Sequence, residues 1–308
     1  MTSSIPVNRT TNGYISRFYD VLMDDITTDY SLLDEKYNIV PDNNYVPQGI
    51  ALVNGYVITS SFDYYKENNS ILNIYDQEGN LFNVCTLEHK AHVGGIAYDK
   101  VNELLWVTAF DGNVSAYNIS DVFNKNKVEA IYSNLNVGHG LTNYVYPWMN
   151  SASFVTIYNN ELYVGNFSLS GDGKVKKFSI NNKDGNVKLQ YVSQFKIPDM
   201  VQGITFYSKN GKEFILFSRS YGRDCSSILQ IFKYDQKVKD YGDSKLSNVT
   251  LKMPPMLEQI VCDDNKLYAL YESNAKPYVY IQSQDFDSIS TIDANELVKK
   301  LELKIDTN

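Results

Sequence analysis

The chain carries a recurring pattern of short apolar segments separated by polar turns. Each unit opens with a segment that ends in an apolar pair, passes through a turn with Asn, Asp or Gly, and returns in a second apolar segment. A third segment follows in which apolar and polar residues alternate, and a period of two is typical of a half-buried β-strand. The five opening segments are Pro47–Ala51, Val93–Ala97, Ser151–Val155, Val201–Thr205 and Leu257–Val261.

Together with the opening segment, the remaining segments of each unit predict four strands. The second segments are Tyr56–Thr59, Leu105–Thr108, Leu162–Gly165, Phe214–Phe217 and Leu267–Leu270. The third segments are Ile71–Tyr75, Val114–Tyr117, Val175–Phe178, Ile228–Phe232 and Tyr278–Ile281. Candidate outer strands, such as Phe82–Thr86 and Val249–Lys252, complete the units.

The spacing of the units predicts the fold. Equivalent positions 49, 95, 153, 203 and 259 are separated by 46, 58, 50 and 56 residues. Four-stranded units repeated at such a period are the sequence signature of propeller blades. We therefore expect an all-β, five-bladed β-propeller over residues 46–290. Six blades are the alternative, because a further blade would fit before Val46 or after Gln282.

The two ends of the chain differ from the repeats. Apolar residues from Tyr14 to Tyr37 fall at roughly helical spacing, and Leu297, Leu301 and Ile305 lie four residues apart. Both patterns predict short helices, one in an N-terminal extension of residues 1–45 and one over residues 291–308, packed on the propeller. Either end is also a candidate to lend the strand that closes the ring, and the sequence does not choose between them.

Composition and charge narrow the classes of partner. The 25 tyrosines and 14 phenylalanines favour a sheet protein. The net charge of −8 comes with no run of five or six basic residues, which argues against a nucleic-acid partner. No apolar run is long enough for a membrane span and no signal peptide opens the chain, so the sequence predicts a soluble protein. The three cysteines are odd in number and lack CxxC spacing, so we expect free thiols.

Several catalytic signatures are absent. The sequence has no Gly-x-Ser-x-Gly elbow, HExxH motif, Walker loop or dinucleotide fingerprint. Nucleophilic hydrolases and nucleotide-dependent enzymes are therefore disfavoured.

The strand starts are the candidate functional positions. The innermost strand of each blade lines the central channel of a propeller, so residues about fifty positions apart converge on the axis. The polar residues at these starts are Gln48, His92, Ser151, Gln202 and Glu258, and the loops after the second strands add Ser60, Asn166, Ser220, Tyr221, Arg223 and Glu272. A few convergent polar groups in a concave site are typical of a ligand site.

These residues support two sets of roles. His92, Glu258, Glu272 and Arg223 are the candidate catalytic groups, and a divalent metal such as calcium is a candidate cofactor in the channel. Ligand-binding candidates are Gln48, Gln202, Asn166, Ser220 and Tyr221, with loop aromatic residues such as Tyr64, Tyr65, Tyr144, Tyr146 and Trp148. Each has a structural alternative: His92 as a turn cap, Arg223 as the ion-pair partner of a glutamate, and the carboxamides as partners of backbone groups.

Several segments of the repeats together resemble a family of microbial proteins, many of them secreted, that look like small propellers and have no assigned activity. The segments that carry this resemblance are Pro47–Gly49, His92–Ala97, Leu162–Phe167, Ser220–Arg223 and Pro254–Glu258 followed by Tyr271–Ser273. The resemblance covers roughly residues 46–278 and implies the propeller fold and an extracellular setting. It implies no substrate, and this chain departs from the secreted members in having no signal peptide.

Two functions follow as hypotheses. The first is a binding module that presents its loops and an axial pocket to a carbohydrate, a small molecule, a surface polymer or a protein partner. The alternative is a hydrolase or lyase, with or without a metal, that works at the channel mouth with His92 and Glu258 or Glu272 as acid, base or metal ligands. The second rests partly on what other propellers do.

Overall fold

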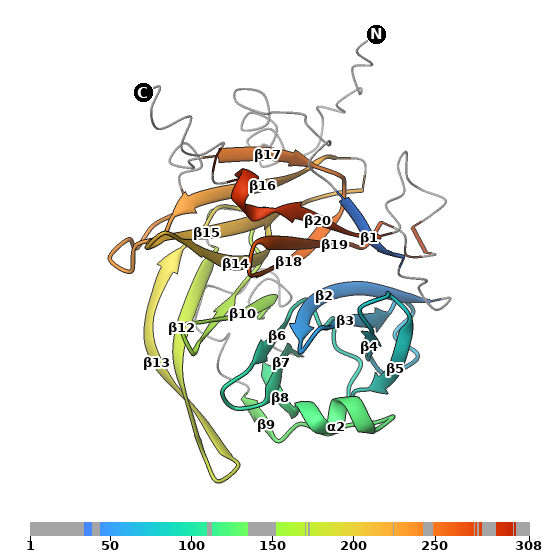
Figure 1. Ribbon diagram of the computed structural model, residues 1–308. Helices are drawn as coiled ribbons and strands as arrows, with labels where there is room; N and C mark the ends of the chain where they lie inside the picture. The colour runs from blue at the N-terminus through green and yellow to red at the C-terminus, as the bar shows by residue number, and fades with distance from the viewer. Residues whose placement is uncertain are drawn as a thin grey trace.

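Five four-stranded antiparallel sheets surround a common centre in the computed structural model (Figure 1). The structure describes residues 34–38, 44–109, 113–134, 152–169, 171, 173–223, 225–242, 249–273, 275, 277–278, 288–297 and 299. The fold is a five-bladed β-propeller, and this prediction from the repeats is confirmed. Within the described residues, no helix is long and apolar enough to cross a membrane.

Each blade runs from an inner strand at the axis to an outer strand at the rim. Blade 1 contains β2 (Tyr45–Val53), β3 (Tyr56–Asp63), β4 (Ile71–Tyr75) and β5 (Leu81–Thr86). Blade 2 contains β6 (Ile96–Asp99), β7 (Leu104–Thr108), β8 (Val114–Asn118) and β9 (Tyr132–Asn134), with the short helix α2 (Ile119–Asn124) after β8. Blade 3 contains β10 (Phe154–Tyr158), β11 (Glu161–Gly165), β12 (Lys174–Lys183) and β13 (Asn186–Lys196).

The last two blades complete the ring. Blade 4 contains β14 (Val201–Lys209), β15 (Lys212–Arg219), β16 (Ser227–Lys233) and β17 (Val249–Met253). Blade 5 contains β18 (Leu257–Asp263), β19 (Lys266–Tyr271), β20 (Ser288–Asp293) and, as its outer strand, β1 (Asp34–Asn38).

The N-terminal segment closes the ring. Strand β1 pairs antiparallel with β20, with Asp34 opposite Thr291 and Asn38 opposite Ser288. The predicted helix is therefore wrong for residues 34–37, because pairing with blade 5 overrides the local helical spacing. The rest of that predicted helix lies outside the described residues.

The third strand of blade 5 also differs from the prediction. Tyr278 lies in a turn, where its backbone N–H donates to the Ala275 carbonyl at 2.7 Å. The third strand is instead β20, whose Asp293 pairs with Lys266 of β19. Residues 294–297 are helical directly after it, and Ala294 and Leu297 are buried.

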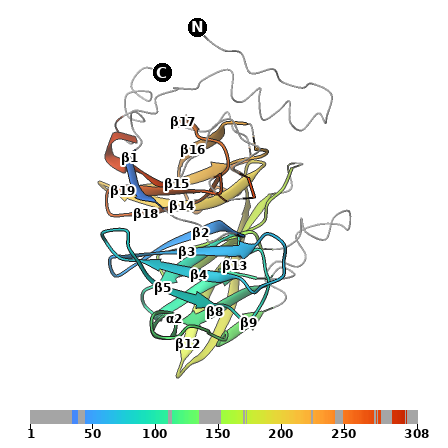
Figure 2. The same ribbon diagram turned by 90° about the vertical axis from the view of Figure 1, so that its right-hand side faces the viewer.

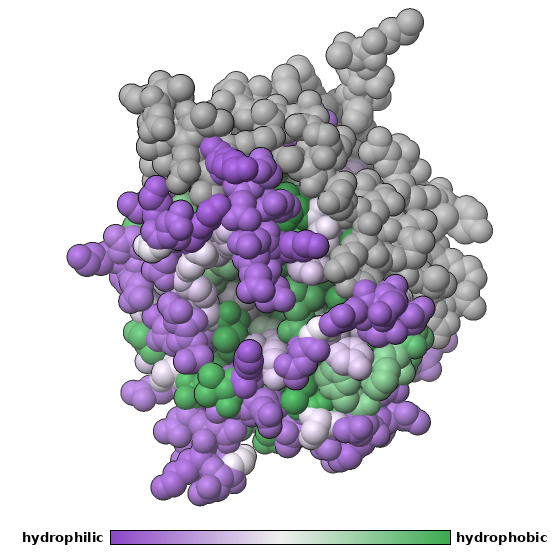
Figure 3. Space-filling model, in the orientation of Figure 1, coloured by the Kyte–Doolittle hydropathy of each residue, from purple (hydrophilic) through white to green (hydrophobic). Residues whose placement is uncertain are grey.

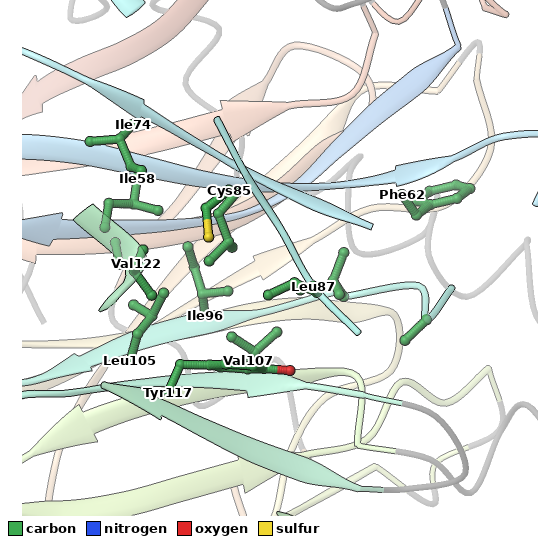
Figure 4. Close-up of a cluster of buried hydrophobic side chains, with 14 of the residues drawn as sticks. Ile58, Phe62, Ile74, Cys85, Leu87, Ile96, Leu105, Val107, Tyr117 and Val122 are labelled. Atoms are coloured by element: carbon green, nitrogen blue, oxygen red, sulfur yellow. The ribbon is translucent and has the colours of Figure 1, made fainter. Parts of the chain in front are cut away.

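Apolar side chains fill the spaces between blades. Figure 4 shows one such cluster, in which Ile58, Ile74 and Cys85 of blade 1 lie near Ile96 and Leu105 of blade 2. Alternation along each strand sends every second side chain to one face, so each blade buries apolar residues against both neighbours. Burial raises the pKa of the Cys85 thiol to about 11, and none of the three cysteines forms a disulfide bond.

Glycines at the strand starts allow neighbouring blades to approach closely at the axis. A Cβ atom built on Gly95 would lie 2.7 Å from the Cα of Phe154, and one on Gly203 would lie 2.9 Å from the Cα of Gln259. Both distances are shorter than a carbon–carbon contact tolerates. The repeated glycine is therefore required by the approach of one inner strand to the next.

The fifth blade carries Gln259 at the equivalent position, and its carboxamide bonds across the axis. The oxygen accepts hydrogen bonds from the backbone N–H groups of Ile50 and Ile96, both at 2.9 Å. The nitrogen donates to the carbonyls of Ile96 at 2.7 Å and Val155 at 3.0 Å. One buried side chain of blade 5 thereby joins the inner strands of blades 1, 2 and 3.

Hydroxyl groups on the second strands add links between successive blades. Ser60 Oγ accepts from the Gly49 N–H and donates to the Val93 carbonyl at 2.8 Å. Ser218 Oγ donates to the Glu258 carbonyl at 2.6 Å in the same way. These bonds connect blade 1 to blade 2 and blade 4 to blade 5.

We predict that Gln259→Leu lowers the free energy of unfolding by about 3 kcal/mol, because it leaves backbone groups of three blades buried without partners. Urea unfolding followed by circular dichroism measures the effect. The matched control is Gln236→Leu at an exposed position, where we expect a change within about 0.5 kcal/mol. Equal stability of the two variants would contradict the bridging role of Gln259.

Candidate functional site

The inner strands of three blades begin with the same backbone irregularity. The pairing register shifts between Pro47 and Gly49, between Val201 and Gly203, and between Leu257 and Ile260. Such β-bulges re-aim side chains and are frequent beside functional sites. The residues at these shifts are Gln48, Gln202, Glu258 and Gln259. The repeat therefore aims polar side chains at one end of the axis.

Left-handed backbone conformations lie just before the inner strands at the same end. The φ angles are 50° at Val93, 62° at Met200 and 62° at Met256. Positive φ is unfavourable for these residues, most of all for β-branched valine, and such strain tends to gather at functional sites. The Met256 carbonyl accepts a hydrogen bond from the Glu272 N–H at 3.1 Å, which fixes the loop that carries Glu272.

Two glutamates of blade 5 form the electrostatic centre of the site. Glu258, at the start of β18, is 4% exposed, and Glu272, after β19, is half-buried. Burial and then the charge of Glu272 hold the pKa of Glu258 well above its usual value. Burial also raises the pKa of Glu272 to about 7, although the Gln48 hydrogen bond and the Arg223 charge oppose that rise. The pair therefore retains a proton near neutral pH.

Gln48 is the direct partner of this pair. Its Nε2 donates to Glu272 Oε2 at 2.7 Å and to the Pro47 carbonyl at 2.9 Å. Blade 1 thus contributes a buried carboxamide to the acidic centre of blade 5. The hydrogen bond favours the ionised form of Glu272, so Gln48 partly offsets the cost of burying its charge.

Arg223 and two tyrosines complete the cluster. The Arg223 guanidinium lies 4.4 Å from the centroid of the Tyr278 ring, a cation–π contact. The Tyr278 ring meets Tyr64 of blade 1 edge to face at 5.7 Å. Burial, followed by the charge of Glu272, raises the pKa of Tyr278. Among the described residues, Arg223 forms no ion pair within 4.0 Å of either glutamate.

His92 lies at the same end, on blade 2, but packs on an aromatic ring. Its imidazole is 4.5 Å from the ring of Phe62. The side chain is exposed to solvent, yet the protein around it lowers its pKa to about 4, with the charge of Lys66 adding to the effect. His92 is therefore neutral near pH 7, and no hydrogen bond joins it to a glutamate in the described part of the chain.

The remaining candidates divide between structural contacts and exposed positions. Asn166 is buried, and its Oδ1 accepts from the Lys174 N–H at 3.0 Å. The Ser220 hydroxyl is also buried and bonds to the Ser227 hydroxyl at 2.9 Å. Tyr221 is 37% exposed beside Phe167, and Gln202 is half-buried. The candidates Ser151, Tyr144, Tyr146 and Trp148 lie outside the described residues.

The oxygen atoms of this cluster are its candidate cation ligands. They belong to the carboxyl groups of Glu258 and Glu272 and to the carboxamide of Gln48, and oxygen donors are the ligands that calcium prefers. In the described ranges, no group of three or more His, Cys, Asp and Glu residues is placed to hold a metal ion.

Sequence reasoning did not identify Gln259 or Tyr278 as residues of this region. A comparison of the five opening segments distinguishes Gln259, because the other four repeats carry Gly49, Gly95, Ser153 and Gly203 at the equivalent position. A long polar side chain at a position otherwise reserved for small residues indicates that it fills space at the axis. Tyr278 was placed in a strand, and that placement hid its contact with Arg223.

The blades and the polar cluster define the chain as a five-bladed β-propeller with a candidate site at one end of its axis. No protein-family model and no curated protein matches the chain. Among solved structures, U3-55K aligns with a TM-score of 0.46 and 9% identity over 87% of this chain and 100% of that chain. The β-propeller domain of Myceliophteria thermophila Cps50 (Swd1) gives 0.41 and 11% over 80% and 83%. The Dos1 propeller gives 0.38 and 13% over 86% and 64%.

The raised pKa of Glu272 predicts a pH-dependent stability. The folded chain holds this proton up to about pH 7, whereas an unfolded glutamate loses it near its usual 4.5. The free energy of unfolding should therefore fall as pH rises through this window and then level off. Glu272→Gln removes the part of the dependence that Glu272 contributes, and we expect this variant to be about 1–2 kcal/mol more stable than the wild type near pH 8 but not near pH 4.5.

Urea unfolding at a series of pH values tests this expectation. The control is Glu129→Gln at an exposed position, which should run parallel to the wild type. A stability difference between Glu272→Gln and the wild type that does not change with pH would contradict a proton held by Glu272.

Proposed function

We propose that this chain is a binding module whose ligand docks at the end of the axis where the inner strands begin. The observation that carries the proposal is a cluster in which Gln48 bonds to Glu272, the charge of Arg223 acts on Glu272, and the Arg223 guanidinium lies over Tyr278. It draws polar groups from blades 1, 4 and 5 to one place. Blades 4, 5 and 1 are consecutive in the ring, and their inner strands begin at this end of the axis.

The chemistry of the cluster supports a polyhydroxylated ligand such as a carbohydrate. Carboxyl oxygens accept hydrogen bonds from hydroxyl groups, and the fork of Arg223 donates to ring and hydroxyl oxygens. Exposed tyrosine rings at the same end offer flat apolar surfaces, with Tyr64 36% exposed and Tyr65 61% exposed. Such rings stack on the apolar faces of sugars, which gives contact area without a charged partner.

We expect a glycan array to identify a bound carbohydrate, and titration calorimetry to show that Glu272→Ala and Arg223→Ala each weaken its binding at least tenfold, or about 1.4 kcal/mol. Glu129→Ala, at an exposed position away from the cluster, serves as the control and should bind as the wild type does. Unchanged affinity in both site variants would place the ligand elsewhere and sink the proposal.

One observation favours an enzyme as the second candidate function. Burial raises the pKa of both glutamates, and that of Glu272 to about 7, so the pair supplies both a carboxylic acid and a carboxylate near neutral pH. A carboxylic acid and a carboxylate held together are the groups that hydrolysis of a glycosidic bond requires. The acid would protonate the leaving oxygen, and the carboxylate would take a proton from the water whose oxygen bonds to the sugar carbon.

Reducing-sugar release from the bound glycan separates the two functions. If the chain is a hydrolase, Glu258→Gln and Glu272→Gln should each lower turnover by at least a hundredfold while the glycan still binds. Measurement of metal content in the purified protein, before and after Glu258→Ala, tests a divalent cation at the same place. A glycan that binds and stays intact favours the binding module alone.

A further inference from the structure

The charges of this acidic chain are unevenly distributed. Residues 174–239 contain 13 of its 28 basic residues but only 5 of its 36 acidic ones. That fifth of the sequence has a net charge of +8, and the rest has −16. The basic stretch runs from β12 of blade 3 to the loop after β16 of blade 4. The stretch includes Arg223 of the axial site and the inner strand β14, but it also includes β13, which is the outer strand of blade 3 and lies at the rim of the propeller.

A long two-stranded ribbon starts the basic stretch. Strands β12 and β13 pair over ten registered positions and meet at the turn Asp184–Gly185, whose φ angles are 53° and 80°. Two successive positive φ angles define the hairpin turn that matches the twist of the strands. The tip projects past the neighbouring strands in both ribbon views (Figures 1 and 2) and is hydrophilic in Figure 3.

The ribbon has one packed side and one polar side. Phe178 and Val187 belong to the apolar cluster shared with blade 2, and Ile180 and Leu189 pack against it. The cross-strand pairs on the other side are Ser179 with Gln190, Asn181 with Lys188, and Lys183 with Asn186. The lysines Lys183 and Lys188 are exposed. Among the described residues neither of them forms an ion pair.

The outer edge of β13 is the open edge of blade 3 and lies at the rim of the propeller. In the described sheets β12 is its one neighbouring strand, and two apolar residues on it are exposed, Tyr191 by 53% and Val192 by 47%. An edge strand offers unpaired backbone groups to an incoming chain, and lysines on it repel a second copy of the same edge. The same lysines attract a segment of opposite charge.

The chain itself already adds a segment to the end of this edge. The Lys196 N–H donates to the Lys239 carbonyl and the Tyr241 N–H donates to the Lys196 carbonyl, both at 2.9 Å. Lys196 and Asp240 form a parallel bridge, and Lys196 Nζ lies 3.9 Å from Asp240 Oδ2. At this position, the extended segment that contains Asp240 pairs with β13, and its carboxylate lies beside Lys196.

We propose that the edge of β13 over residues 186–195 is a docking site for an extended, acidic peptide segment of a partner protein. The segment adds to blade 3 as a fifth strand, through backbone hydrogen bonds like those of Lys196. Its carboxylates lie near Lys183 and Lys188, and its apolar residues lie beside Tyr191 and Val192. The proposal is independent of the axial site.

The basic surface continues beyond the strand. Lys233, Lys237 and Lys239 line a shallow pocket of about 800 Å³ next to this edge, together with Glu213 and Asp235. Lys239 also supplies the carbonyl that pairs with Lys196. An acidic segment that leaves the end of β13 therefore meets further positive charge, which steers its approach and fixes its direction.

The test uses a fluorescent, end-capped ten-residue peptide of alternating Glu and Val and measures binding to the full chain by anisotropy. We expect binding that weakens as salt is raised, and an affinity at least tenfold lower in Lys183→Glu/Lys188→Glu. Lys100→Glu/Lys127→Glu, which reverses two exposed charges of blade 2, lowers the net charge by the same amount and should bind as the wild type does.

A second peptide separates strand addition from charge alone. The same sequence with N-methyl groups on alternate residues keeps every carboxylate but loses the backbone donors of one edge. If the two sets of alternate residues are methylated in turn, at least one of the two peptides should lose binding. Hydrogen exchange should also show protection of β13 amides by the unmodified peptide.

Three outcomes would overturn the proposal. They are equal binding by the unmodified peptide and both N-methylated peptides, equal binding to the wild type and to Lys183→Glu/Lys188→Glu, and no binding at millimolar peptide.

Discussion

The carboxamide of Gln259 is the interaction on which the centre of this propeller depends. Inner strands that approach closely bury backbone groups at the axis, and a buried group without a partner is costly. Gln259 meets two N–H groups and two carbonyls from three other blades with one side chain. The glycines at the equivalent positions admit that side chain, because any Cβ there would meet a neighbouring strand.

The candidate site follows from the same constraint. A strand that must place Gln259 across the axis begins with a bulge, and the bulge turns the preceding Glu258 toward the end of the axis, near Glu272. The same irregularity in blade 1 brings Gln48 within 2.7 Å of Glu272. The structural requirement at the axis and the chemistry at its end therefore occupy adjacent residues of each repeat.

Periodicity was sufficient to predict the blades, because each repeat buries two apolar faces and its strands alternate with a period of two. It failed at residues 34–37 and at Tyr278, where long-range pairing with β20 decides which segment becomes a strand. The prediction that these positions converge on the axis placed Gln48, Glu258, Glu272 and Arg223 at one end, as they lie in the structure. Which of them touch depends on loop conformation, so the Arg223–Tyr278 contact and the structural bonds of Asn166 and Ser220 could not be read from the sequence.

The closure of the ring by β1 also has a kinetic consequence. Its partner β20 lies about 250 residues later in the chain, so this pairing has one of the largest sequence separations in the fold. Long-range pairing of this kind slows folding. During synthesis, blades 1 to 4 can form while β1 has no partner, and the sheet that joins the two ends must form last. β1 therefore waits for its partner during most of translation, and its charged residues Asp34, Glu35 and Lys36 disfavour aggregation of this segment in that interval.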